Sequence, residues 1–252
     1  MLCFKNLVSL ATFTSTGATA INLTQAGTLK RAYKDGACTL TAAGLKTLRA
    51  VFGSTQSVSV IAWLGATCSV DGDELYGFYC PATGDLKEIE QNFRLRAHQT
   101  ETICAVFPQL INPATTFDLN CPGTAQNVTM RQLWIGDGIR SLPGINMQRV
   151  SLGGAEIVQP SSGAIFTAVR PSWRKYSVTL PAVTDAQWGD AGGLLELESL
   201  GNGTEALLMP GGVSSDAARV GLLAIHGSIT NFGSQQIKRG LRAVTFDVTE
   251  CR

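Results

Sequence analysis

The sequence predicts a mainly β protein: an N-terminal jelly roll or β-sandwich, then a C-terminal β-rich domain with one short helix. Three observations predict this fold class. The 252 residues include 27 glycines, and only 15% are charged while 44% are hydrophobic, which is typical of a turn-rich globular chain. Short runs of β-branched or alternating residues recur along the chain, and turn residues separate them. The length allows one domain or two.

The strongest strand of the first part is 57–66 (SVSVIAWLGA). Its centre is β-branched and apolar on both faces, which indicates a strand in the middle of a sandwich. The segment 45–52 fits either a helical turn or a further strand. The spacing of the segments, roughly eight strands in about 135 residues, is typical of a sandwich or jelly roll. The other strands predicted here are 7–14, 18–23, 37–41, 75–80, 92–97, 102–107 and 127–135.

A Gly-, Pro- and Ser-rich stretch at 139–164 predicts a connecting arm with one short strand at 150–158. The second domain, 165–252, begins with a long strand-like run at 166–180. Thr184 and Gln187 have the spacing of a helix-capping box, so we expect a helix near 184–200, weakened by Gly192-Gly193. The segment 241–250 is predicted to be a strand that alternates two sets of residues: Leu241, Ala243, Thr245 and Asp247 against Arg242, Val244, Phe246 and Val248. Shorter strands are predicted at 206–209 and 220–231.

Charge and cysteine usage exclude several classes of protein. The net charge is +1 and no segment concentrates Lys or Arg, which argues against a nucleic-acid partner and against adsorption to anionic membranes. The seven cysteines form no C-x-x-C pair, so no zinc site is expected; they fit buried thiols, while a pairing of Cys80 with Cys104 or Cys121 stays open. The N-terminal apolar run is too short for a secretory signal, and no run reaches the length of a membrane span, so we expect a soluble protein made in the cytosol.

No arrangement typical of catalysis is visible. His98 lies in a polar turn and His226 inside a strand, and neither has a nucleophile at a recognisable spacing. Asp71, Asp73 and Glu74 resemble the start of a calcium loop but lack its later ligands. Phosphate-binding glycine loops and the G-x-S-x-G motif are absent. The sequence therefore predicts a non-enzymatic protein with no catalytic residues, no metal and no cofactor.

Three of the four tryptophans can be interpreted from their neighbours in the sequence. Trp63 and Trp134 lie in apolar strands and are expected in the core. Trp173 lies in the basic and aromatic segment 170–176, which fits a protein interface or sugar stacking, or else a half-buried indole covered by an Arg or Lys stem. The candidate interface residues are Arg140, Arg149, Arg170, Trp173, Arg174, Lys175 and Tyr176.

Four segments carry a resemblance to a known family: 52–62 (FGSTQSVSVIA), 129–136 (TMRQLWIG), 173–180 (WRKYSVTL) with the helix expected after it, and 227–230 with 243–251. Their order resembles that of tail-tip or baseplate minor tail proteins of long-tailed, siphophage-like bacteriophages. The resemblance implies a galactose-binding-like jelly roll at 1–138, a connecting arm at 139–164 and a β-rich tail-assembly domain at 165–252.

The same resemblance implies a structural component of a phage tail tip, assembled in the host bacterial cytoplasm and carried on the virion. Its partners would be other tail proteins (tail hub, tail tube and fibre), in an oligomeric ring, and a host glycan. Neither nucleic acid nor a membrane span is implied. One alternative is a carbohydrate-binding module that recognises a host surface glycan. A further alternative is a glycan hydrolase that uses Asp73 or Glu74.

Overall fold

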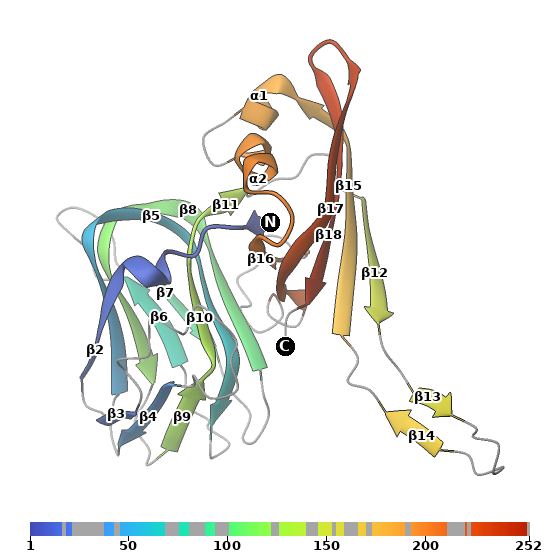
Figure 1. The fold of residues 1–252 in the computed structure, drawn as a ribbon. Coiled ribbons are helices and arrows are strands. Elements are labelled where there is room, and N and C mark those ends of the chain that lie inside the picture. The colour runs from blue at the N-terminus through green and yellow to red at the C-terminus, as the bar shows by residue number, and fades with distance from the viewer. Residues whose placement is uncertain are drawn as a thin grey trace. The chain divides into compact units, whose positions relative to one another are not determined.

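The computed structural model describes residues 1–16, 19–21, 38–42, 46–68, 76–80, 89–93, 101–121, 126–139, 146–152, 155–158, 166–169, 173–189, 193–210, 220 and 223–250. The protein is mainly β, which confirms the predicted class (Figure 1). The chain divides into two compact units. Unit 1 consists of Met1–Ser141 and Leu207–Ala224, and unit 2 of Leu142–Ala206 and Ile225–Arg252. The segment Leu207–Ala224, which the sequence placed with 165–252, thus belongs to unit 1.

Unit 1 is built on a curled, sandwich-like sheet whose two longest strands are β5 (Lys46–Cys68) and β8 (Glu101–Cys121). These two strands pair along much of their length and arch together in Figure 1. One half of β5 also pairs with β2 and the other half with β10. The remaining strands of this sheet are β2 (Ala11–Thr16), β3 (Thr19–Ile21), β4 (Cys38–Ala42), β6 (Tyr76–Cys80), β7 (Ile89–Phe93), β9 (Gln126–Met130) and β10 (Gln132–Gly136).

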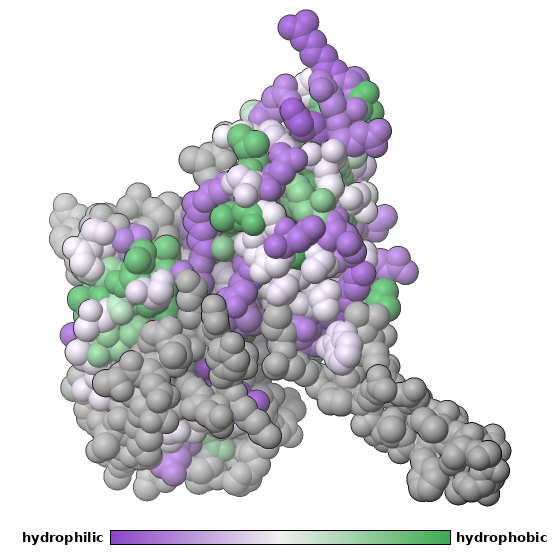
Figure 2. All heavy atoms as spheres, in the orientation of Figure 1, coloured by the Kyte–Doolittle hydropathy of each residue, from purple (hydrophilic) through white to green (hydrophobic). Residues whose placement is uncertain are grey.

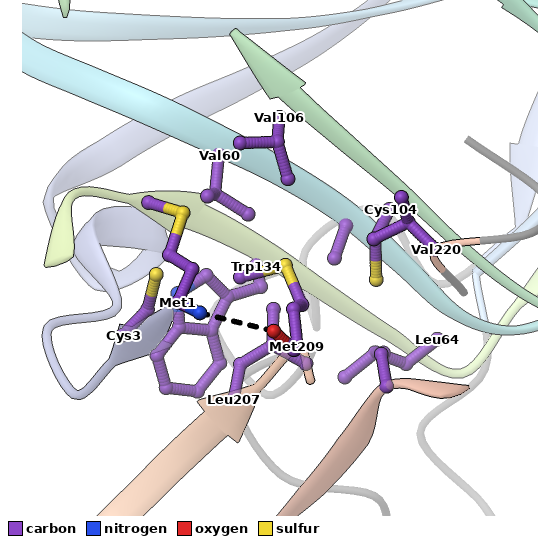
Figure 3. Packing of buried hydrophobic residues seen from close by; sticks show 12 residues of the cluster. Met1, Cys3, Val60, Leu64, Cys104, Val106, Trp134, Leu207, Met209 and Val220 are labelled. Atoms are coloured by element: carbon purple, nitrogen blue, oxygen red, sulfur yellow. Dashed lines mark hydrogen bonds between the residues drawn. The ribbon is translucent and has the colours of Figure 1, made fainter. Parts of the chain in front are cut away.

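The core of unit 1 forms around the strand that the sequence singled out. Every residue from Val58 to Trp63 is buried. The stretch is apolar except for Ser59, and from Val60 to Trp63 it is paired with β10 on one side and with β8 on the other. Trp63 and Trp134 are fully buried, as predicted. Figure 3 shows the apolar cluster that includes Trp134, in which the Met1 amino group donates a hydrogen bond of 3.0 Å to the Met209 carbonyl oxygen.

The Asn6 side chain links the N-terminal segment to β10. The amide nitrogen of Asn6 donates to the Leu133 carbonyl oxygen at 3.1 Å, and the amide oxygen of Asn6 accepts from the Ile135 backbone N–H at 3.3 Å. The chains approach so closely that a Cβ added at Gly136 would lie 2.1 Å from the Lys5 carbonyl oxygen. The strand predicted at 127–135 is two strands, β9 and β10, with a bend at Arg131. The short strands β1 (Leu2–Cys3) and β11 (Gly138–Ile139) pair with each other, and the 3-10 helix Leu7–Leu10 precedes β2.

Unit 2 contains an antiparallel sheet in the order β16-β17-β18-β15-β12, to which β16 contributes Glu205 and Ala206. The predicted arm at 139–164 contains β12, which pairs with β15 over seven residues. The strand predicted at 150–158 is the end of β12 and a separate strand, β13, which pairs with β14. The bounds are β12 (Asn146–Leu152), β13 (Ala155–Val158), β14 (Phe166–Val169), β15 (Trp173–Thr184), β16 (Glu205–Leu208), β17 (Ile225–Lys238) and β18 (Leu241–Glu250).

One face of this sheet is the core of unit 2. Val244, Phe246 and Val248 are buried on β18, which confirms the predicted alternation. Their register partners on β15 are Leu180, Val178 and Tyr176, which are buried too. The Phe232 ring stacks on the Phe246 ring with centroids 6.1 Å apart. The buried side chains of the two helices, Trp188, Leu194 and Leu197, complete this core.

The single helix predicted near 184–200 is two short helices, α1 (Asp185–Gly189) and α2 (Leu194–Leu200). The capping box at the start of α1 is confirmed. Gln187 accepts from the Thr184 backbone N–H at 3.0 Å, and the Gln187 backbone N–H donates to the Thr184 hydroxyl at 3.3 Å. α2 starts afresh with Gly193 as its N-cap, in an extended conformation. Glycine is a poor helix interior residue and a tolerated cap, which explains the break.

Candidate functional site

The side of the unit 2 sheet opposite its core carries mostly polar side chains, and we call it the polar face. Strand alternation and register place its members, because residues two apart on a strand share a face and register partners lie side by side. Lys175 and Ser177 on β15 alternate with buried Tyr176 and Val178, and Ser177 is the partner of Asp247. The polar face consists of Gln148, Val150, Trp173, Lys175, Ser177, Ser228, Thr230, Asn231, Asp247 and Thr249.

A hydrogen-bond network at the centre of the polar face is organised by the Asp247 carboxylate. Asp247 Oδ1 accepts from the Ser177 hydroxyl at 2.6 Å. Asp247 Oδ2 accepts from Asn231 Nδ2 at 2.7 Å and from Lys175 Nζ at 2.8 Å. Three strands thus contribute to one cluster, which holds both donors and acceptors in fixed positions.

The environment of Asp247 favours its charged form. Burial raises the pKa of this carboxyl, but the hydrogen bonds from Lys175, Ser177 and Asn231, together with the Lys175 charge, outweigh the burial. The pKa of Asp247 therefore lies below its usual value. An ionised carboxylate is a strong acceptor and accepts shorter hydrogen bonds than a neutral group.

The backbone at Asn231 supports the network. Asn231 has a φ of +53°, in the left-handed region, and the β17–β18 register shifts between Thr230 and Gly233. Asn tolerates this conformation better than most residues, and the bulge turns its side chain toward Asp247. A β-bulge that re-aims a polar side chain is frequent beside binding sites.

An exposed apolar strip borders the network. The Trp173 side chain is 39% exposed and Val150 is 36% exposed. Trp173 precedes Lys175 by two residues on the same face, which is a separation of about 7 Å along the strand. Val150 is the register partner of Lys175 on β12. The polar face therefore offers an indole surface beside an ordered set of polar groups.

The candidate interface residues do not form one surface, because neighbours along a strand point to opposite faces. Trp173 and Lys175 lie on the polar face. Arg174 lies on the other face, where its guanidinium donates to Glu250 at 2.7 Å and its backbone N–H donates to the same carboxylate at 2.8 Å. Tyr176 is only 5% exposed and belongs to the core, and its register partner Arg149 is exposed at the β12 edge. The other two candidates, Arg140 and Arg170, lie outside the described residues.

Sequence reasoning did not identify Ser177, Asn231 and Asp247 as site residues. The alternation in 241–250 does assign Asp247 to the side opposite Val244 and Phe246, and this was the available signal. Ser177 is 70 residues away from Asp247 in the sequence, so no local pattern contains this contact. Asn231 lies on the neighbouring strand of the β17–β18 hairpin, but the shift in register beside it is not visible in the sequence.

The described residues show no other group arranged for chemistry. Asp247 and Glu250 lie on opposite faces of β18, each bound to a cation, so they do not face each other across a cleft. His226 is buried, and burial lowers its pKa to about 4. In the same part of the chain no cluster of His, Cys, Asp and Glu could hold a metal ion, and no helix is long and apolar enough to cross a membrane. His98, Asp71, Asp73 and Glu74 fall outside the described residues.

The described cysteine side chains agree with the prediction that the cysteines are buried thiols. Cys3, Cys68 and Cys104 are all buried in unit 1. Cys80 and Cys121, the other members of the pairing left open, have side chains outside those described.

Comparison with known proteins finds no matching family model and no matching curated protein. Among solved structures, the chain is similar to the lectin domain of lectinolysin complexed with Lewis B antigen. The TM-score is 0.41 at 8% identity, over 54% of this chain and 98% of that one. It is also similar to a fucose binding module of Streptococcus pneumoniae (TM-score 0.39, 8% identity, 52% and 94%) and to a family 29 carbohydrate binding module (0.34, 13%, 52% and 84%).

Proposed function

We propose that this protein is a non-catalytic carbohydrate-binding protein whose ligand lies on the polar face of unit 2. The observation that carries the proposal is the exposed indole of Trp173 on the same face as the Asp247 network. Binding sites commonly combine an apolar surface with a few polar groups that fix the orientation of the ligand.

The chemistry of this face fits a sugar. The C–H groups of a pyranose ring carry small positive charge and pack against the negative face of an indole. Sugar hydroxyls both donate and accept, and the network presents a carboxylate and a hydroxyl as acceptors beside an ammonium and an amide as donors. Because these side chains already hold one another, little side-chain entropy is lost when a ligand binds.

The charge of the region favours an uncharged ligand. Lys175 is paired with Asp247, and Arg174 is paired with Glu250, so the two cations of the segment are neutralised by two carboxylates. Phosphates or other anions need uncompensated cations or clustered backbone N–H groups. A neutral oligosaccharide therefore fits better than a nucleic acid or an acidic polymer.

Replacing the indole tests the proposal. In a screen of immobilised neutral glycans, we expect the protein to bind a defined set, and Trp173→Ala to bind the same set at least about tenfold more weakly. Arg149→Ala is the matched control, because Arg149 is exposed on a neighbouring strand but belongs to the opposite face. Equal binding by wild type and Trp173→Ala, or loss of binding in Arg149→Ala alone, would contradict the assignment.

A second candidate is the structural role in a phage tail tip that the sequence resemblance implies. The observation that favours it is the edge strand β12, which ends the unit 2 sheet and exposes Asn146, Gln148, Arg149 and Val150. An edge strand can pair with a strand of another chain, which suits repeated assembly. Co-expression with proteins encoded by neighbouring reading frames tests this role: a complex that Val150→Pro weakens would support it, and no complex with any of them would count against it.

A further inference from the structure

The polar face of unit 2 continues beyond the Asp247 network, on the side away from Trp173, in three polar side chains here called the distal row: Asn146, Thr179 and Thr245. Thr179 is the register partner of Asn146 on β12 and of Thr245 on β18, so the three lie side by side across three neighbouring strands (Figure 1). All three are exposed. Neither threonine hydroxyl bonds to another group within the described ranges, so both are open to a ligand.

A glycine on the next strand leaves the distal row uncovered. Gly233 is the register partner of Thr245 on β17. A Cβ at Gly233 would lie 3.5 Å from the Thr245 hydroxyl oxygen, so a longer side chain there would cover that hydroxyl. The distal row therefore offers hydroxyl and amide groups, which both donate and accept hydrogen bonds, on an accessible surface.

The β15 residues on the polar face form a line of groups that one extended ligand can contact in succession. Residues two apart on a strand are separated by about 7 Å, so the line from Trp173 to Thr179 is about 20 Å long. It begins at an indole, passes Lys175 and Ser177 in the Asp247 network, and ends at the distal row. Hydrophobic and hydrophilic residues also lie side by side on the surface of unit 2 in Figure 2. The line is longer than a single sugar ring, and its three zones differ in chemistry.

The network in the middle of this line keeps hydrogen-bonding positions for a ligand. The Lys175 ammonium and the Asn231 amide each have more than one N–H donor, and each gives one to Asp247. Their remaining donors, and the Asn231 amide oxygen, have no partner in the part of the chain that the structure describes. Asp247 is only 9% exposed, so it positions Lys175 and Asn231, and these two contact the ligand. Adjacent sugar hydroxyls, which donate and accept, fit such a set.

We propose that the ligand of the polar face is an extended neutral oligosaccharide of three or more sugars that lies along β15, an inference that rests on the proposed function of this face. One sugar ring packs on the Trp173 indole. The hydroxyls of the next sugar bond to Lys175 and Asn231, and a further sugar bonds to the hydroxyls of Thr179 and Thr245. A sugar chain that ran across the strands would meet only one of these zones, and on one side it would leave the sheet at β12, the edge strand beside β15.

The length of the site is tested by isothermal titration calorimetry of the full chain. The probes are cello-, malto- and manno-oligosaccharides from the monosaccharide to the hexasaccharide, with shortened forms of any other neutral glycan that binds in the screen. In a series that binds, we expect the dissociation constant to fall at least ~10-fold from the monosaccharide to the longer members, and to level off once the sugar chain spans the line. A monosaccharide that binds as tightly as its oligomers would overturn this inference and leave the proposed function intact. If no glycan of any length binds, the proposed function itself fails.

The direction of the sugar chain is tested by removing hydroxyls from the distal row. Thr179→Val and Thr245→Val keep the β-branched shape and remove one hydrogen bond, so each should weaken the longer oligosaccharides by about two- to tenfold and leave the shortest binding member unchanged. Trp173→Ala should weaken every length. Thr12→Val is the matched control, because Thr12 is an exposed strand residue of unit 1.

The pattern over ligand length decides the placement. If Thr179→Val and Thr245→Val weaken every length equally, or weaken none, the placement along β15 is wrong. Equal losses in Thr12→Val would contradict it as well. Circular dichroism melting identifies a variant that fails to fold, and in that case the other threonine variant and the length series of the wild type still give the answer.

Discussion

The buried histidine of β17 makes the stability of this protein depend on pH. His226 is 8% exposed, and burial lowers its pKa from 6.5 to about 4. Since one pKa unit corresponds to about 1.4 kcal/mol, the full effect on the free energy of unfolding is roughly 3 kcal/mol. By linkage, the free energy of unfolding is about 2 kcal/mol lower at about pH 5 than at neutral pH because of this histidine.

The sign follows from which state binds the proton. Below pH 6.5 the unfolded chain protonates His226, whereas the folded protein resists protonation until the pH approaches 4. The unfolded state is therefore favoured progressively as the pH falls through this window. Asp247 affects stability at lower pH. Folding lowers the pKa of its carboxyl, so the stability that its ionised form contributes is lost only as the pH falls below 3.8, the usual pKa of the group.

The contribution of His226 can be measured by urea unfolding of the wild type and of His226→Gln, from neutral pH down to about pH 4. The difference between the two proteins isolates His226 from every other titrating group. We expect the free energy of unfolding of the wild type to fall more steeply than that of the variant, with the excess reaching roughly 3 kcal/mol near pH 4. Parallel pH profiles would refute the reasoning, because they would show that His226 has the same pKa in both states.

Two further substitutions test the local structure. Gly136→Ala places a Cβ 2.1 Å from the Lys5 carbonyl oxygen, so we expect a loss of about 1–3 kcal/mol in denaturant unfolding, whereas Gly53→Ala, with nothing within 4 Å, should lose less than half as much. Thr184→Ala removes the hydroxyl that caps α1 at Gln187, and a loss of about 1 kcal/mol is expected in the same assay. If Gly136→Ala leaves the free energy of unfolding unchanged, the close approach to Lys5 does not constrain the fold. If Thr184→Ala leaves it unchanged, the capping box does not contribute to stability.

Features governed by local pattern were predictable from the sequence. The buried run at Val58–Trp63 and the alternation of Val244, Phe246 and Val248 follow from strand periodicity, and both are observed. The capping box at Thr184 follows from the spacing of two residues. In each case the determining contacts lie within a few residues of one another.

Features governed by contacts between distant segments were not predictable. The return of Leu207–Ala224 to unit 1 depends on packing against residues near the N-terminus, such as the bond from Met1 to Met209. The Asp247 network requires the register of three strands and the bulge at Asn231. The segment 173–176 looked like one basic and aromatic surface, but pairing assigns its members to two faces, because β-strand side chains alternate.

The most direct test of the polar face is the response of the individual indole N–H signals in NMR spectra as a neutral oligosaccharide is added. Trp63, Trp134 and Trp188 are buried, so Trp173 is the tryptophan open to a ligand. If the account is right, the Trp173 indole signal shifts in proportion to saturation, with the backbone amides of Ser177 and Asp247, while the other three indoles stay in place. A saturable ligand that leaves the Trp173 signal unmoved, or moves residues of unit 1 instead, would contradict it.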